Sequence, residues 1–185
     1  LEPQGQPVQG MDVSAWQGEI DFEQVRAWGI RTVYIRAAVG QGRQDKDWRA
    51  NYRKAKAAGL KVGLYHYVTA RSQDQAREQA EFFAGLMEGL DMDCRPAMDF
   101  ESFGDMSKEQ INQAALAYVT RLERLCGGKP AVYSNSWTAA HVFDQRLADY
   151  PLWIAEYGPD QPREGGPWKA WAGFQYTSQG RVQGI

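Results

Sequence analysis

Short apolar runs alternate with longer amphipathic segments along almost the whole chain. A short run of apolar and β-branched residues between turn residues is typical of a buried strand. Seven segments fit this description, and we predict strands at Met11–Trp16, Thr32–Ala38, Lys61–Tyr67, Pro96–Glu101, Ala131–Asn135, Leu152–Tyr157 and Ala170–Tyr176.

Four helices are predicted between these strands by their end signals and their apolar spacing. Asp21, Ser72 and Ser107 each stand three residues before a glutamine, which is the pattern of an N-terminal capping box. The first of these helices ends at Gly29, and a helix without this signal runs from Asp47 to Ala58. Apolar residues three, four and seven positions apart give the last three helices one buried stripe each. The stripes are Trp48, Tyr52 and Ala55; Ala76, Ala80, Phe83 and Met87; and Ile111, Ala115, Tyr118, Leu122 and Leu125.

The order of strands and helices indicates an α/β fold with parallel strands and right-handed crossovers. Five strand–helix units are followed by three closer-spaced elements in which the helical pattern fades. A doubly wound open sheet is the competing architecture, but the turn at Trp16-Gln-Gly-Glu lacks its glycine-rich phosphate motif. We therefore favour a barrel, in which catalytic groups lie at the C-terminal ends of the strands.

Length and charge restrict the classes of function. A chain of 185 residues suits one domain, and a net charge of −2 excludes the broad basic field of a protein that coats nucleic acid. We expect no membrane partner, no cofactor and no metal, since no apolar run is long enough to span a bilayer and His66 and His141 have no metal-ligand spacing. Residues 1–9 are polar and rich in Pro, Gly and Gln, so we predict a flexible leader before one domain at 10–185.

Cys94 and Cys126 leave two interpretations open. Cys94 lies just before the strand predicted at Pro96, and Cys126 ends the helix that precedes the next strand. In a β/α barrel both positions fall at the N-terminal face, on neighbouring units. A disulfide between them is therefore geometrically possible, and two free thiols are the alternative.

Two acids on one predicted strand are the strongest chemical signal. Asp99 and Glu101 are two positions apart, so they point to one side of the strand near its C-terminal end. Two neighbouring carboxyl groups, one protonated and one ionised, can cleave a glycosidic bond. Two solvated acids without a catalytic role would show the same spacing. Asp12 shares a face of the first strand with Ser14 and Trp16, as a structural acceptor or a third active-site acid.

Tyrosines alternate with other residues on the neighbouring strands. Tyr65 and Tyr67 face one way and His66 faces the other, and Tyr34 shares a face with Arg36. These side chains fit either a packed layer inside the barrel or the wall of a sugar-binding site.

These residues belong to an ordered set of motifs, through which the chain resembles the glycoside hydrolase family 25 lysozymes. The resemblance implies an irregular, TIM-barrel-like β/α barrel with about eight strands and five helices. It implies hydrolysis of the β-1,4 bond between N-acetylmuramic acid and N-acetylglucosamine in peptidoglycan. The motifs are Gly-Met-Asp-Val-Ser-Ala-Trp-Gln-Gly at 10–18, the segment 51–67, Met-Asp-Phe-Glu at 98–101, Val-Tyr-Ser-Asn at 132–135, Leu-Trp-Ile-Ala-Glu-Tyr at 152–157 and Phe-Gln-Tyr-Thr-Ser-Gln-Gly at 174–180.

The resemblance also implies roles for individual residues. Glu101 falls at the position of the general acid, Asp99 at the second acid, and Asp12 at an acid of the first strand in the same groove. Positions that resemble substrate-groove residues are Tyr65, Tyr67, Tyr133, Trp153, Tyr157 and Gln175, with Arg36 matching less specifically.

Two departures from the family pattern stand near the end of the chain. Phe174 replaces the usual tryptophan, which removes an indole N–H donor. The chain ends at Ile185, whereas family members continue into a last strand with a further aspartate. Either the sequence is trimmed, or the barrel is open and has one acid fewer; we expect a trimmed C-terminus.

The leading interpretation is a muramidase that acts outside the cell or in the cell envelope as a monomer, with peptidoglycan glycan strands as its partner. A non-catalytic peptidoglycan-binding module is an alternative, but it would not need the proton-donating acid. A chitinase-like hydrolase is the other, and Arg95-Pro96-Ala97 lacks the extra aspartates of that motif. Because Asp99 and Glu101 rise from one strand, we expect a retaining, substrate-assisted mechanism with Glu101 as the acid.

Overall fold

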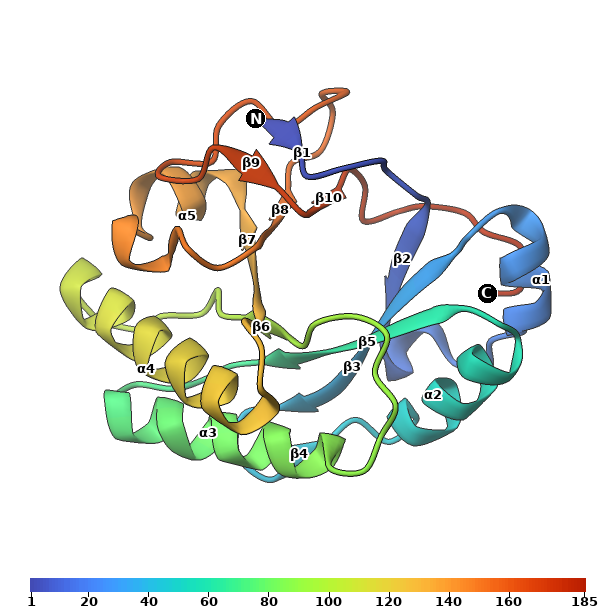
Figure 1. Cartoon of the computed structure of the whole chain (residues 1–185), viewed down its shortest axis with the longest axis horizontal. Helices are drawn as coiled ribbons and strands as arrows, with labels where there is room; N and C mark the ends of the chain where they lie inside the picture. Colours follow the sequence, from blue (N-terminus) through green and yellow to red (C-terminus); the bar gives the residue numbers. More distant parts are fainter.

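Seven parallel strands form the main sheet, in the order β10-β8-β7-β6-β5-β3-β2, and five helices accompany them in the computed structural model, which describes residues 1–185 (Figure 1). The sheet curves into a near-closed barrel, as predicted, and β4 adds an antiparallel edge to β3. The strands of this sheet are β2 Gly10–Val13, β3 Thr32–Val39, β4 Arg43–Gln44, β5 Lys61–Tyr67, β6 Ala97–Asp99, β7 Ala131–Asn135, β8 Leu152–Ala155 and β10 Gly173–Gln175. A separate pair consists of β1 Glu2–Pro3 and β9 Ala170–Trp171. The helices are α1 Phe22–Trp28, α2 Trp48–Ala57, α3 Gln73–Met87, α4 Lys108–Cys126 and α5 Ser136–His141, with short 3-10 turns at Ala15–Gln17 and Gln145–Leu147.

Local signals account for the helix ends. The side chains of Asp21, Ser72 and Ser107 each accept a hydrogen bond from the backbone N–H of the glutamine three residues later, at 3.1–3.2 Å. These bonds satisfy backbone donors that a helix N-terminus leaves free. At the other end of α4, Gly127 adopts the left-handed conformation with φ of 75°, which glycine enters without a steric cost.

The apolar stripes of α2, α3 and α4 bury the residues that their spacing predicts, except for Tyr52, which is partly buried, and Leu125. Leu125 is 45% exposed, because it lies in the last turn of α4, next to an open pocket at the helix end. In Figure 1, α3 and α4 lie side by side along the outside of the sheet. Their small residues Ala76, Ala80 and Ala115 are fully buried, which lets the helices approach the core closely.

His66 points away from the barrel interior, opposite to Tyr65 and Tyr67, as the strand alternation predicts. Its Nδ1 lies 2.8 Å from the Tyr118 hydroxyl and its Nε2 lies 2.8 Å from the Gly40 carbonyl oxygen. The carbonyl can only accept, so Nε2 carries the proton and Nδ1 accepts from the tyrosine. Burial lowers the pKa of His66 to about 4.

Aromatic rings fill the interior of the barrel. The Trp153 ring centroid lies 4.8 Å from that of Tyr34 and 4.7 Å from that of Tyr133. Tyr34 packs directly on Gly63, where a Cβ would collide with its ring. The strand ends that carry the carboxyl groups therefore lie next to a packed aromatic layer.

Several predicted strands are shorter than expected. β2 stops at Val13 because the Ser14 hydroxyl accepts from the Trp16 N–H and starts a 3-10 turn. The segment predicted as one strand at 170–176 is divided between β9 and β10, which belong to different sheets. Gly173 begins β10 and places its backbone close against the Trp153 ring, an approach that a side chain would block.

The segment 1–9, which the sequence predicts as a flexible leader, contains one short strand. Glu2–Pro3 pair with β9, and the backbone N–H of Gln4 donates to the Trp171 carbonyl at 2.8 Å. Polar composition disfavours a buried segment but leaves the backbone free to pair with the edge of β9. At the other end, the Asp21 N–H donates to the Gly184 carbonyl at 2.7 Å and places the C-terminus beside α1 (Figure 1).

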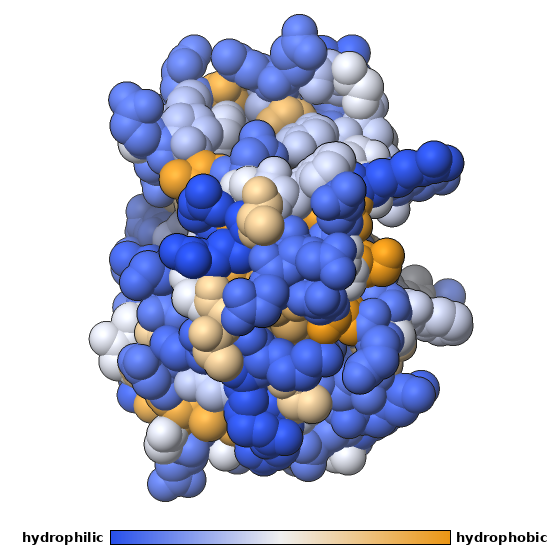
Figure 2. All heavy atoms as spheres, turned by 90° about the vertical axis from the view of Figure 1, so that its right-hand side faces the viewer, coloured by the Kyte–Doolittle hydropathy of each residue, from blue (hydrophilic) through white to orange (hydrophobic).

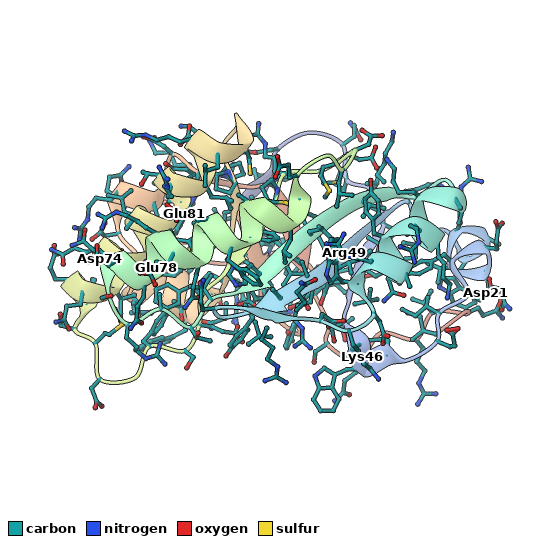
Figure 3. All side chains as sticks on the ribbon, turned by 90° about the horizontal axis from the view of Figure 1, so that it is seen from below. Asp21, Lys46, Arg49, Asp74, Glu78 and Glu81 are labelled. Carbon is teal, nitrogen blue, oxygen red and sulfur yellow. The ribbon has the colours of Figure 1, made fainter.

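Polar residues dominate the face of the molecule that carries α1 and α2 (Figure 2). Figure 2 shows the side that carries α1 and α2, where hydrophilic atoms surround small hydrophobic spots. From below, charged side chains such as Glu78 and Glu81 project from α3 (Figure 3). None of the helices combines the length and the apolar character that crossing a membrane requires.

Candidate active site

Three carboxyl groups meet in a pocket of about 350 Å³ at the C-terminal ends of the strands. Asp12 comes from β2, Asp99 ends β6, and Glu101 follows two residues later. Parallel strands bring their C-terminal ends to one edge of the sheet, so these acids converge although they are far apart in sequence. The lining residues are Asp12, Val13, Ser14, Trp16, Gln17, Arg36, Tyr65, Tyr67, Asp99 and Glu101.

Asp99 and Glu101 occupy different environments within the pair. Asp99 is only 8% exposed and its Oδ1 has no hydrogen-bond partner, whereas Glu101 is exposed. Burial raises the pKa of Asp99 well above its ordinary value, and the neighbouring Glu101 and Asp12 carboxyls raise it further, against the opposing charge of Arg36. Asp99 therefore keeps a proton at pH values where an ordinary aspartate is ionised.

Asp12 is held by a chain of hydrogen bonds. Gln175 Nε2 donates to Asp12 Oδ2 at 2.8 Å, and Gln175 Oε1 accepts from the hydroxyls of Tyr133 at 2.5 Å and Tyr157 at 2.8 Å. An ionised carboxylate can only accept, so the amide N–H₂ faces Asp12 and the amide oxygen accepts from the two hydroxyls. Burial raises the pKa of Asp12, and the bond from Gln175 opposes this rise.

The pocket also contains two tyrosines and one cation. Burial raises the pKa of Tyr65 and of Tyr67, and the nearest acids add to the shift, Asp12 for Tyr65 and Glu101 for Tyr67. Both hydroxyls therefore stay protonated and available as donors. Arg36 is the positive charge of the pocket lining, so it balances part of the negative charge of the three acids.

Comparison with known proteins assigns this chain to a family. The profile of Glycosyl hydrolases family 25 matches residues 11–185. The chain belongs to this family. The Autolytic lysozyme of Clostridium acetobutylicum is 35% identical over 178 residues, covering 96% of this chain and 53% of that protein. Lysozyme M1 of Streptomyces globisporus is 30% identical over 194 residues, covering 96% of this chain and 64% of that protein.

Solved structures show the same fold. The bacterial lysozyme from Streptomyces coelicolor superposes with a TM-score of 0.83 at 27% identity, covering 98% of this chain and 88% of that one. The chain thus spans most of this neighbour but only about half of the clostridial relative's length.

The structure brings together most of the residues that the resemblance to family 25 implies as site residues, and they form two groups. Tyr65, Tyr67 and Arg36 line the pocket beside the three acids, while Tyr133, Tyr157 and Gln175 form the hydrogen-bonded chain behind Asp12. Trp153 is placed differently. Its ring packs against Tyr34 and Tyr133 and meets Tyr65 edge-on at 6.2 Å, and it is not among the residues that line the pocket.

Asp45 is a site residue that the sequence pattern does not reveal. It is buried, its Oδ2 accepts from Arg36 Nε and Nη2 at 3.2 Å each, and the same oxygen accepts from the Ala15 N–H at 2.9 Å. It therefore orients Arg36 and holds the turn that follows β2. Asp45 follows β4 in a polar segment, and no local spacing distinguishes it from the exposed acids nearby.

No group of three or more His, Cys, Asp or Glu side chains lies close enough to hold a metal ion. The acids of the pocket are accompanied by tyrosines, an amide and an arginine. Such donors suit the hydroxyl and acetamido groups of a sugar.

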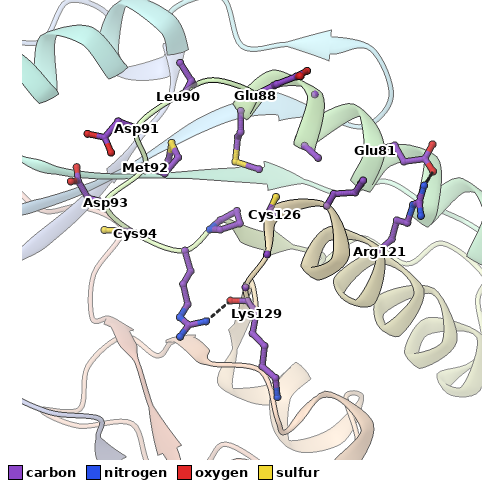
Figure 4. A pocket seen from close by; sticks show the side chains of 18 residues that line it. Glu81, Glu88, Leu90, Asp91, Met92, Asp93, Cys94, Arg121, Cys126 and Lys129 are labelled. Carbon is purple, nitrogen blue, oxygen red and sulfur yellow. Dashed lines mark hydrogen bonds and ion pairs between the residues drawn. The ribbon is translucent and has the colours of Figure 1, made fainter.

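A second pocket of about 1010 Å³ lies at the opposite, N-terminal end of the strands, beside the ends of α3 and α4 (Figure 4). Cys94 and Cys126 both line it, but they stand on different segments of its wall and are free thiols. The disulfide interpretation is therefore wrong. The backbone N–H of Cys94 donates to the Val62 carbonyl at 3.1 Å and holds this segment against β5, away from the end of α4.

Proposed function

We propose that the chain is a muramidase that hydrolyses the β-1,4 bond between N-acetylmuramic acid and N-acetylglucosamine in peptidoglycan. The observation that carries this proposal is the convergence of Asp12, Asp99 and Glu101 in one pocket of a family 25 chain. The relatives named as lysozymes support it. Because the chain spans about half of the first relative, the activity and targets of a longer protein are part of the proposal.

In this account Glu101 delivers the proton to the leaving oxygen. Glu101 is the exposed member of the pair and can reach a bound glycan, while Asp99 is buried beside it. Two acids this close share a proton rather than ionise independently, and Asp99 is where burial favours holding it. Proton passage from Asp99 to Glu101 would prepare a proton donor and an ionised aspartate together.

The substrate itself supplies the nucleophile in this proposal. Asp99 and Glu101 come from the end of one strand rather than from different strands, which is unsuited to a direct attack on the opposite face of the anomeric carbon. The carbonyl oxygen of the 2-acetamido group attacks that carbon as the glycosidic bond breaks, and ionised Asp99 stabilises the acetamido N–H of the cyclic intermediate. Water then opens the intermediate, and the anomeric configuration is retained.

The remaining residues orient the glycan and the acids. Asp12, held by Gln175, contributes negative charge near the developing positive charge without a covalent bond to the sugar. Tyr65, Tyr67 and Arg36 offer donors to sugar hydroxyl and carbonyl oxygens. Tyr133, Tyr157 and Trp153 act mainly through the groups that they hold.

The place of action and the state of the protein follow from this substrate. Peptidoglycan lies outside the cytoplasmic membrane, so we propose that the protein works in the cell envelope or outside the cell. A single chain contains all three acids of the pocket, which is sufficient for a monomeric enzyme.

Loss of turbidity of purified cell walls tests the proposal against its two alternatives. A muramidase lowers the turbidity, whereas a binding module sediments with the walls and leaves the turbidity unchanged. Chitin oligomers in a parallel assay separate a chitinase-like hydrolase, which cleaves them faster than peptidoglycan. The mechanism is tested by proton NMR of the first product: a retained anomer is expected, and an inverted anomer or a covalent adduct on Asp99 contradicts it.

A further inference from the structure

Trp16 is a large apolar side chain with no function in the mechanism above. It is 85% exposed, yet it lines the pocket that holds the three carboxyl groups. No ring–ring or cation–π pair of the structure involves it. An indole left in water beside a polar pocket offers a flat apolar surface that only a ligand can cover.

The backbone beneath this ring is held firmly. The Ser14 hydroxyl accepts from the Trp16 N–H at 3.2 Å, and Gln17 Oε1 accepts from the Ser14 N–H at 2.6 Å, which closes a capping box around the turn. Asp45 ties the same turn to the barrel through the Ala15 N–H. Trp16 is therefore presented on an ordered turn, and this turn loses little backbone freedom when a ligand covers the ring.

The other groups around Trp16 suit the polar edge of a sugar. Ser14, Gln17 and Arg36 present hydroxyl, amide and guanidinium groups, and the acids occupy the same pocket. A pyranose ring has polar hydroxyls at its edge and apolar C–H groups on its faces. The pocket thus combines polar groups for the edge with one aromatic surface for a face.

We propose that Trp16 is a sugar-binding platform, on which one ring of the glycan stacks beside the bond to be cleaved. This inference rests on the proposed function and adds a specificity-determining residue to it. Stacking binds the glycan through a sugar ring that does not react. This contact orients the bond to be cleaved over Glu101. Glycans long enough to cover Trp16 should be preferred over shorter ones.

Calorimetric titration of a tetrasaccharide of alternating N-acetylglucosamine and N-acetylmuramic acid tests this, with Glu101→Gln as the parent so that the ligand stays intact. Adding Trp16→Ala should weaken binding about tenfold, and Trp16→Phe should keep most of the affinity because it retains a flat ring. Trp28→Ala is the matched control, since Trp28 is 54% exposed at the end of α1 and outside the pocket. In the otherwise unchanged enzyme, Trp16→Ala should raise KM more than it lowers kcat, with the melting temperature unchanged.

The outcomes separate this inference from the function on which it rests. Equal affinity of the parent and the Trp16→Ala variant overturns the platform and leaves the muramidase proposal standing. A parent that binds no tetrasaccharide, with an unsubstituted enzyme that cleaves no wall, overturns both.

Discussion

Gln175 Nε2 donates a 2.8 Å hydrogen bond to Asp12 Oδ2 across the gap between the last and the first strands of the barrel. β10 and β2 share no backbone ladder, so this side-chain contact joins the two edges of the sheet at the height of the acids. The Tyr176 hydroxyl, which donates to Gln9 Oε1 at 3.0 Å, is a second contact between the two edges. The seam of the barrel and the position of one acid therefore depend on the same amide.

Replacing Gln175 with alanine is expected to affect both activity and stability. A hydrogen bond to a charged group contributes about 1.5–3 kcal/mol, so we predict a roughly 10–100-fold loss of kcat/KM and a lower melting temperature. Gln179→Ala is the control, because Gln179 is exposed in the same C-terminal segment and its side chain makes no hydrogen bond. Wall-lysis kinetics and thermal unfolding measure the two effects, and full activity in Gln175→Ala would show that Asp12 needs no such partner.

Asp99→Asn should remove activity and stabilise the fold at alkaline pH. The pKa of Asp99 is raised in the folded protein, so between its ordinary value of 3.8 and the raised value the folded state holds the extra proton. Stability contributed by this group therefore falls as pH rises through that range. Asparagine cannot ionise, and we predict a gain of about 1–2 kcal/mol, or roughly 2–8 °C in Tm, at about pH 9.

The control for this variant is Asp149→Asn, at an exposed position that precedes β8 at the other end of the barrel. Its unfolding should match that of the unsubstituted protein at every pH. If the Asp99→Asn variant unfolded at a lower temperature than the unsubstituted protein at alkaline pH, this would contradict a buried carboxyl with a raised pKa at position 99.

His66 should make the protein sensitive to acid. Burial lowers its pKa from 6.5 to about 4. Between these two pH values the imidazole is protonated in the unfolded chain and neutral in the folded protein. Stability present above pH 6.5 is lost as pH falls toward 4, by about 3 kcal/mol for a shift of this size. Denaturant unfolding across this range measures the slope, and His66→Gln should flatten it even if its overall stability is lower. An equal slope in both proteins would assign the acid sensitivity to other groups.

The sequence predicts those parts of the fold that local rules control. The capping hydrogen bonds of Asp21, Ser72 and Ser107 depend on residues three positions apart, and the opposite directions of Tyr65 and His66 depend on strand alternation. Such relationships can be read directly from spacing. The parallel near-barrel follows from the order of these elements.

The remaining features depend on contacts between distant segments. The spacing of Asp99 and Glu101 places them together but does not reveal that one is buried and the other exposed, because this depends on where β6 ends. Asp45 acquires its role only when folding brings Arg36 and Ala15 to it. Cys94 and Cys126 line one pocket and yet are free thiols, which topology alone does not specify.

Mass spectrometry of fragments released from defined peptidoglycan is the most direct test of the central claim, that Glu101 donates the proton for muramidase cleavage. The unsubstituted protein should release fragments with N-acetylmuramic acid at the reducing end. Glu101→Gln keeps the shape but has no proton to transfer, so the rate should fall about 10²–10⁴-fold with unchanged folding. Glu78→Gln, on the exposed face of α3, should match the unsubstituted protein. Reducing ends of N-acetylglucosamine, or near-normal release by Glu101→Gln, would contradict the account.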